Sequence, residues 1–95
     1  MRPLREFWES DSSFADAEMP LRAWYDRALH SNWTCFADLK ATFGSADAVG
    51  NSRIVFNIHG NKYRLVAIVD YKFHGVLIRF VGTHNQYDKI DASKV

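Results

Sequence analysis

The sequence predicts an α+β protein in which N-terminal helices pack on a small antiparallel sheet that is followed by a short C-terminal helix. Three observations lead to this class. Apolar residues recur at helical spacing in the first half of the chain, and they alternate with other residues in the second half. With 95 residues, the chain is long enough for one domain, residues 1–95, with a single core.

Three helices are expected before residue 45. Residues 2–10 carry apolar side chains at i, i+3 and i+4, which form one stripe. A second helix has Pro20 in its first turn, where the missing N–H of proline does least harm, and it ends near residue 30. Thr34 is expected to cap a third, short helix that ends near residue 43.

An antiparallel meander of three strands is expected after these helices. Every second residue is apolar over 53–58, 63–70 and 76–81, and turn-forming residues separate the three segments. Thr83 and Gln86 then have the spacing of a capping box, which predicts the start of the last helix.

The register of the strands decides which side chains share a face. A turn centred between residues 60 and 61 sets Asn57 opposite Arg64, and a turn at Phe73 and His74 sets Thr83 opposite the same arginine. One predicted face is wholly apolar and can receive the helices: Ile54, Phe56, Ile58, Tyr63, Leu65, Ala67, Val69, Val76, Ile78 and Phe80. The other predicted face carries Arg53, Asn57, Arg64, Arg79 and Thr83, with Arg79 opposite Ile68.

Charge is divided unevenly along the chain. Residues 1–52 hold five basic and eight acidic side chains, a net of −3, whereas residues 53–95 hold seven basic and three acidic ones, a net of +4. This asymmetry indicates that the second half faces a polyanion and that the first half is a scaffold.

The start of the last helix adds titratable groups to the arginine face. His84 and Tyr87 lie one helical turn apart, directly after the third strand. RNA cleavage without a metal needs cations for the scissile phosphate and groups that move protons, and histidine titrates close to neutral pH. Each residue also has a plain structural interpretation, since an outward arginine is commonly solvated and Tyr87 could clamp the helix. Their coincidence on one face favours a site.

The sequence predicts no membrane span, signal peptide, metal site or cofactor site. Cys35 is the single cysteine, which fits a reducing cytoplasm, and no apolar run reaches the roughly 18 residues of a membrane span. The N-terminus does not have the pattern of a signal peptide. His30, His59 and His74 are scattered over a helix end and two turns, so neither a metal site nor another cofactor is expected.

Two segments carry a family resemblance. RIVFNIHGNKYRLV at 53–66 and IRFVGTHNQYDKID at 78–91 are similar to the HigB pattern R-V-V-F-N-I-x-G-N-K-Y-R-L-V and I-R-F-V-G-T-H-x-x-Y-D-x-I. The resemblance extends through Trp24, Trp33 and further positions in the helical half, and it covers roughly residues 4–92.

The resemblance implies a RelE-like toxin of a type II toxin–antitoxin pair, in the cytoplasm. Such toxins are typically mRNA interferases that act at the ribosome, and a helix-turn-helix antitoxin, HigA, neutralises them. The resemblance assigns Arg64 and Arg79 to the substrate phosphate and His84 and Tyr87 to the scissile bond. It adds Lys62 and Lys89 to Arg53 and Asn57 as RNA-binding residues.

Two expectations stay open on this basis. RelE-like chains usually begin with a strand, whereas Pro3 here argues against one, so the sheet has three strands or four, and the chain either does without that strand or starts late. The same fold also serves toxins that bind DNA gyrase and cleave no RNA, and this non-enzymatic activity is the alternative function.

Overall fold

The computed structural model describes residues 2–73 and 75–95, and helical segments come first along this part of the chain. They are α1 (Arg2–Glu9), the 3-10 helix η1 (Ser12–Ala17), α2 (Glu18–Leu29) and α3 (Phe36–Thr42). The strands β1 (Asp47–Gly50), β2 (Arg53–Ile58), β3 (Tyr63–Asp70) and β4 (Gly75–Thr83) follow, and α4 (His84–Tyr87) comes last. The predicted α+β class is confirmed.

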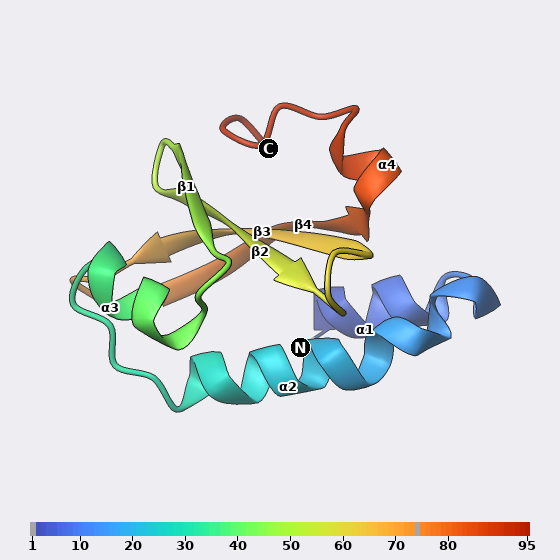
Figure 1. The fold of residues 1–95 in the computed structure, drawn as a ribbon, viewed down its shortest axis with the longest axis horizontal. Coiled ribbons are helices and arrows are strands. Elements are labelled where there is room, and N and C mark those ends of the chain that lie inside the picture. The colour runs from blue at the N-terminus through green and yellow to red at the C-terminus, as the bar shows by residue number, and fades with distance from the viewer. Residues whose placement is uncertain (1, 74) are drawn as a thin grey trace.

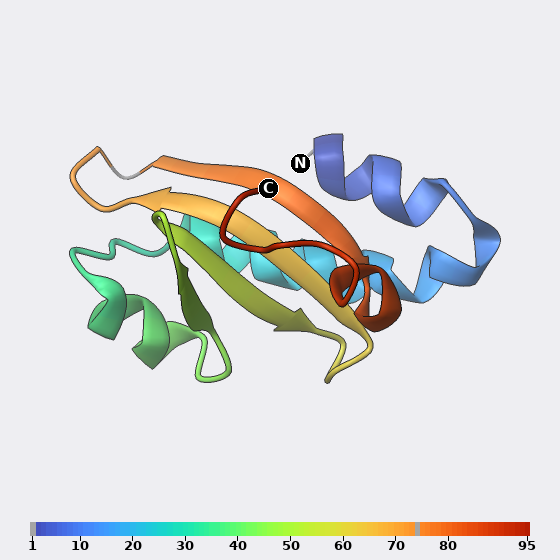
Figure 2. The same cartoon turned by 90° about the horizontal axis from the view of Figure 1, so that it is seen from above.

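The strands form one antiparallel sheet in the order β1-β2-β3-β4. Figure 1 shows α1 and α2 on one side of this sheet, which we call the helix face, and α4 with the C-terminal segment on the other, which we call the outer face. Figure 2 shows the C-terminal segment crossing the sheet on the side opposite α2. The sheet is therefore covered on both faces.

The main core lies between the helices and the helix face. Leu4 and Trp8 of α1 and Leu21 and Trp24 of α2 are buried there, as their helical spacing predicts. The rings of Trp24 and Phe56 meet edge to face at 5.2 Å between centroids, so α2 is fixed directly on β2.

The N-terminal half contains one confirmed and one wrong prediction about helix ends. Pro20 does lie in the first turn of α2, which begins at Glu18. Thr34 does not cap α3, because the N-cap is Cys35, whose side chain makes no capping bond. The hydroxyl and the backbone N–H of Thr34 instead donate to the Asp38 carboxylate, at 2.6 and 3.0 Å.

The fourth strand comes from the middle of the chain. Residues 47–50 pair with β2 and form an edge of the sheet, with an irregularity between Ala48 and Gly50. In the part of the chain that the structure describes, α1 begins at Arg2 and no strand precedes it. The open choice between three and four strands is settled as four among the described residues, and the fourth strand is β1.

The register of β2 with β3 is as predicted, with Asn57 opposite Arg64. The register of β3 with β4 is wrong by one residue, because Gly82, and not Thr83, lies opposite Arg64. The predicted turn includes His74, which lies outside the described residues.

A bulge explains a second error on β4. Phe80 pairs with Val66 and Ile78 pairs with Ala67, so Arg79 is the extra residue between them and does not face Ile68. Leu77 faces Ile68 instead. The bulge also moves Phe80 from the helix face to the outer face.

A second, smaller apolar cluster lies on the outer face. Val55, Val66 and Ala92 are buried in it, and Phe80 and Tyr87 pack against them. This cluster holds the C-terminal segment on the sheet. Within the described ranges, no helix is long and apolar enough to cross a membrane.

Candidate nucleic-acid interface

Arg64 is the centre of the candidate site on the outer face. Its Nη1 donates a hydrogen bond to the side-chain oxygen of Asn57, its cross-strand neighbour. The ring of Tyr87 lies 5.4 Å from its Cζ atom, which is a cation–π distance. The Arg64 Nε atom is buried and has no hydrogen-bond partner among the described residues. The guanidinium is thus fixed by an amide and a ring, and it retains unused donors for an anion.

The short helix α4 brings Tyr87 to this arginine. Thr83 Oγ1 accepts from Gln86 N at 3.1 Å and Gln86 Oε1 accepts from Thr83 N at 2.9 Å, which is the predicted capping box. His84 N donates to the Lys62 carbonyl at 3.2 Å, so the helix start is also tied to the residue that precedes β3. These bonds determine where His84 and Tyr87 lie relative to Arg64.

Gly82 is a structural requirement of the site that the sequence interpretation missed. A Cβ atom at this position would lie 2.5 Å from Cζ of Phe80 and 2.8 Å from Oε1 of Gln86. Gly82 faces Arg64 across the strands, so the absence of a side chain leaves room for the Phe80 ring and for the capping box. A glycine inside an apolar strand is a signal of such close approach, and it could have been used.

His84 is accessible and oriented by a carboxylate. Its Nδ1 lies 3.2 Å from Oδ2 of Asp88, and the His84 side chain is 43% exposed. A carboxylate at Nδ1 favours the tautomer in which that nitrogen carries the proton and Nε2 is an acceptor. The arrangement leaves Nε2 able to take a proton from a ligand.

Arg79 does not join Arg64 on the outer face. It is the exposed bulge residue of the edge strand β4, and it lines a cleft of about 300 Å³ together with Pro3, Glu6 and Phe7 of α1. Its neighbour Phe80 packs near Tyr87, with 6.5 Å between ring centroids. Arg79 is therefore a cation at the edge of the site and not at its centre.

Lys62 is engaged with the N-terminal half. Its Nζ donates to the Asp16 carboxylate, which also accepts from the Tyr63 hydroxyl. The bond from Lys62, followed by the bond from Tyr63, holds the pKa of Asp16 below its ordinary 3.8. The same carboxylate raises the pKa of Lys62 above its ordinary 10.5. His59 adds a second basic group, 3.7 Å from Asp16.

Arg53 and Lys89, the remaining predicted RNA contacts, have different surroundings. Arg53 Nε donates to the Val95 carbonyl at 2.7 Å, so its guanidinium is occupied by the C-terminal segment. Lys89 is exposed and lies two residues beyond the end of α4. The structure thus brings together Arg64, Asn57 and Tyr87, with His84 on the same helical turn.

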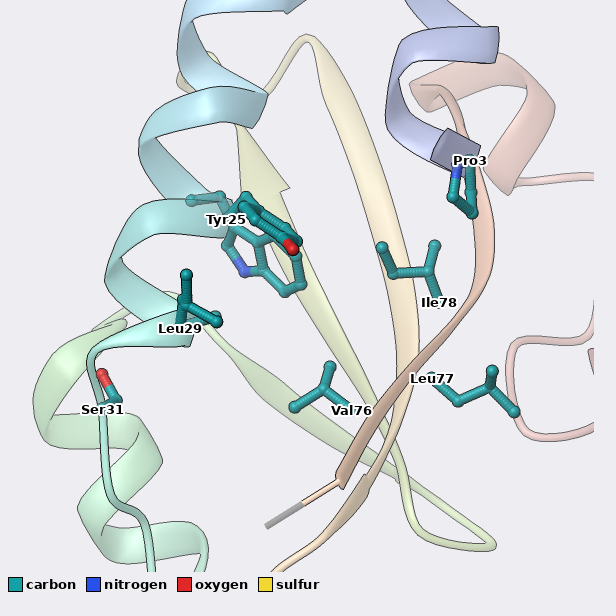
Figure 3. A pocket seen from close by; sticks show the side chains of 9 residues that line it. Pro3, Tyr25, Leu29, Ser31, Val76, Leu77 and Ile78 are labelled. Atoms are coloured by element: carbon teal, nitrogen blue, oxygen red, sulfur yellow. The ribbon is translucent and has the colours of Figure 1, made fainter. Parts of the chain in front are cut away.

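A large groove lies away from these groups, between α2 and β4. It has a volume of about 480 Å³, and Figure 3 shows Tyr25 and Leu29 facing Val76 and Ile78 across it. Leu29 and Leu77 are 65% and 55% exposed. No charged side chain of the described residues lines this groove, so it suits a protein contact better than a phosphate. Among residues 2–73 and 75–95, no three potential metal ligands lie together.

The fold and the site describe a small α+β protein with a cationic and aromatic outer face. Residues 17–90 match the model of the HigB toxin family, described as the RelE-like toxic component of a toxin–antitoxin system. The match covers more than half of the chain, and the chain belongs to this family. A comparison with curated proteins gives no match. Membership implies that the protein has an antitoxin partner.

Proposed function

We propose that this toxin is an endoribonuclease that cleaves mRNA on the ribosome in the cytoplasm. The observation that carries the proposal is the Arg64 guanidinium, held by Asn57 and stacked on Tyr87, with His84 one turn away on α4. A partly buried arginine that keeps N–H groups without a bond to described residues suits a phosphate, because charge-assisted and bidentate bonds to anions are the strong ones. A toxin that only binds a protein has no need of an accessible histidine at this place.

The proposed reaction is an in-line displacement at phosphorus. His84 Nε2 removes the proton of the 2′-OH, and the 2′-oxygen attacks the phosphorus that Arg64 holds. The bond from phosphorus to the 5′ oxygen breaks, and the Tyr87 hydroxyl donates a proton to that oxygen. The products are a 2′,3′-cyclic phosphate and a 5′-OH, and solvent returns the proton from His84 to Tyr87. No metal or other cofactor takes part in this scheme.

The other basic residues have supporting roles in this proposal. Arg79 extends the positive field along the edge of β4, and Lys89 does so beyond α4, where both contact phosphates that flank the scissile one. Lys62 contributes to the same field less strongly, because Asp16 neutralises it. Asn57 fixes the plane of Arg64, and Arg53 is the second phosphate contact on the outer face.

The proposed partner is a HigA-type helix-turn-helix antitoxin. The exposed apolar groove between α2 and β4 supports a stable protein contact, and the basic second half supports attraction to an acidic segment. Association that slows as the salt concentration rises is the expected behaviour of this pair.

The test is to express the chain without an antitoxin and to follow labelled precursors of protein and DNA. We expect protein synthesis to stop first, with cellular mRNA cut inside coding regions. If DNA synthesis stopped first and double-strand breaks accumulated, the gyrase-binding alternative would replace the ribonuclease.

A further inference from the structure

The last residues of the chain lie on the outer face of the sheet. We call residues 88–95 the strap, because they leave α4 and run back over the sheet towards β1, as Figures 1 and 2 show. Ala92 is only 8% exposed, since its methyl group packs against Val55 and Val66. The strap therefore covers the part of the outer face that adjoins Arg64 and Tyr87.

Two side chains of the β1–β2 hairpin hold the strap. Asn51 Nδ2 donates to the Ser93 carbonyl at 2.8 Å, and Arg53 Nε donates to the Val95 carbonyl at 2.7 Å. Arg53 Nη1 also donates to the Asn51 carbonyl at 3.0 Å, which fixes the arginine beneath the strap. The strap itself is turned by Asp91, whose carboxylate accepts from the backbone and the hydroxyl of Ser93.

A polyanion could replace the contacts between the strap and the sheet. Arg53 bonds one acceptor of the strap, the Val95 backbone oxygen, whereas a phosphate can offer two parallel charged acceptors to a guanidinium. The apolar contribution of the strap is modest, because it comes from the Ala92 methyl group and from Val95, which is only partly buried. A polyanion that reaches this face can thus compete with the strap for Arg53.

We propose that the strap is an autoinhibitory segment, which RNA must displace to reach Arg53 as a second phosphate contact beside Arg64. The inference rests on the proposed function, since it concerns access to the same site. In the closed form, the strap occupies Arg53 through the bond to Val95. Displacement would expose a longer track of outer face from Arg64 to Arg53. The apparent affinity for RNA is then the intrinsic affinity multiplied by the fraction of molecules in which the strap is open.

The test uses variants that loosen the strap in two independent ways. Ala92→Asn places a polar group between Val55 and Val66, where it has no room. Asn51→Gly removes the bond to Ser93, and glycine tolerates the positive φ of 53° at this position. The control is Ala41→Asn, the same substitution at an exposed position of α3. Thermal unfolding establishes that each variant is folded.

The probe is a six-nucleotide 2′-O-methyl RNA of mixed sequence, which binds but cannot be cleaved, measured by fluorescence anisotropy over a range of salt concentrations. We expect both loosened variants to bind about tenfold more tightly, which corresponds to about 1.4 kcal/mol. The slope of log K against log salt should steepen by about 0.7, the value for one added phosphate contact on a single strand. Adding Arg53→Gln should remove both effects, and Ala41→Asn should show neither.

The outcomes separate this inference from the proposed function. If the parent protein cleaves mRNA while the loosened variants keep its affinity and salt slope, the strap does not control access and the inference is wrong alone. If the parent neither binds the probe nor cleaves mRNA, the ribonuclease proposal fails and the inference fails with it.

Discussion

Arg64→Lys is the substitution that tests the central group of the site. Lysine keeps the positive charge but has a single nitrogen, so it cannot at once bond Asn57, stack on Tyr87 at 5.4 Å and present two parallel donors to a phosphate. An interaction that stabilises transition-state charge typically contributes a factor of about 10²–10³ in rate, or roughly 2.7–4 kcal/mol. We expect a loss of that size in the cleavage rate.

The effect of Arg64→Lys on stability should be much smaller than its effect on rate. The variant loses a cation–π contact of about 0.5–2 kcal/mol. It also removes the buried, unpartnered Nε, whose desolvation costs about 1–3 kcal/mol. Because these two contributions oppose each other, the free energy of unfolding should fall by no more than about 1 kcal/mol. A large loss of activity then cannot be attributed to unfolding.

The assay is single-turnover cleavage of ribosome-bound mRNA by folded protein. Arg27→Lys is the matched control, because the Arg27 guanidinium also lies 5.4 Å from an aromatic ring, that of Phe43, but belongs to α2 on the helix face. We expect the control to cleave at the parental rate. If Arg64→Lys cleaved within about threefold of the control, the assignment of Arg64 to the scissile phosphate would be wrong, since the expected factor is about 10²–10³.

Three further predictions concern proton transfer, packing and pH. His84→Ala should lower the cleavage rate about 10²–10⁴-fold, and a parental rate in this variant would refute the role of His84 as base. Tyr87→Phe should lower the rate as much as Tyr87→Ala does if the Tyr87 hydroxyl is the acid, but less if only the ring contributes. Gly82→Ala should lower the free energy of unfolding by about 1–3 kcal/mol in urea titrations, because its Cβ meets Phe80 and Gln86 at 2.5 and 2.8 Å; an unchanged midpoint would show that these neighbours yield without cost. Asp16→Asn should be less stable than the parent near neutral pH. This difference in stability should shrink as the pH falls below 3.8 and through the lowered pKa of Asp16, because the parent carboxylate is then protonated too. A difference in stability that is independent of pH would exclude the ionic link with Lys62.

The α+β class and most elements of this fold could be predicted because each has a periodic pattern or a local signal. The helical stripe of Leu4 and Trp8 and the capping box of Thr83 and Gln86 are examples. β1 lacked such a signal, because its four residues, Asp47–Gly50, are too few to show alternation. Its place in the sheet depends on pairing with β2, which is a non-local property.

The register of β4 could not be predicted for a physical reason. The predicted register kept Phe80 off the outer face. In the structure the strap and α4 cover that face, so an aromatic side chain is as stable there as on the helix face. Apolar residues at nearly every position from Val76 to Val81 then fit either alternation, and the bulge at Arg79 uses that freedom.

The candidate site was predictable only where the strand register was predicted correctly. Arg64 and Asn57 were placed together by a register that follows from a short turn, and this pair is present. Arg79 was placed with them by the β4 register, and it lies at the edge instead. The bond of Lys62 to Asp16 and that of Arg53 to Val95 join positions 46 and 42 residues apart, which no local pattern encodes.

The most direct test of the ribonuclease account is the chemistry of the cut. The purified toxin is incubated with ribosomes that carry an mRNA with a mapped cleavage position, and then with the same mRNA in which only the cleaved nucleotide is 2′-deoxy. The account predicts a 2′,3′-cyclic phosphate and a 5′-OH from the first mRNA and no cut at that position in the second, because the nucleophile is absent. Cleavage of the 2′-deoxy mRNA at the same position and rate would contradict attack by the 2′-oxygen and the roles given to His84 and Tyr87.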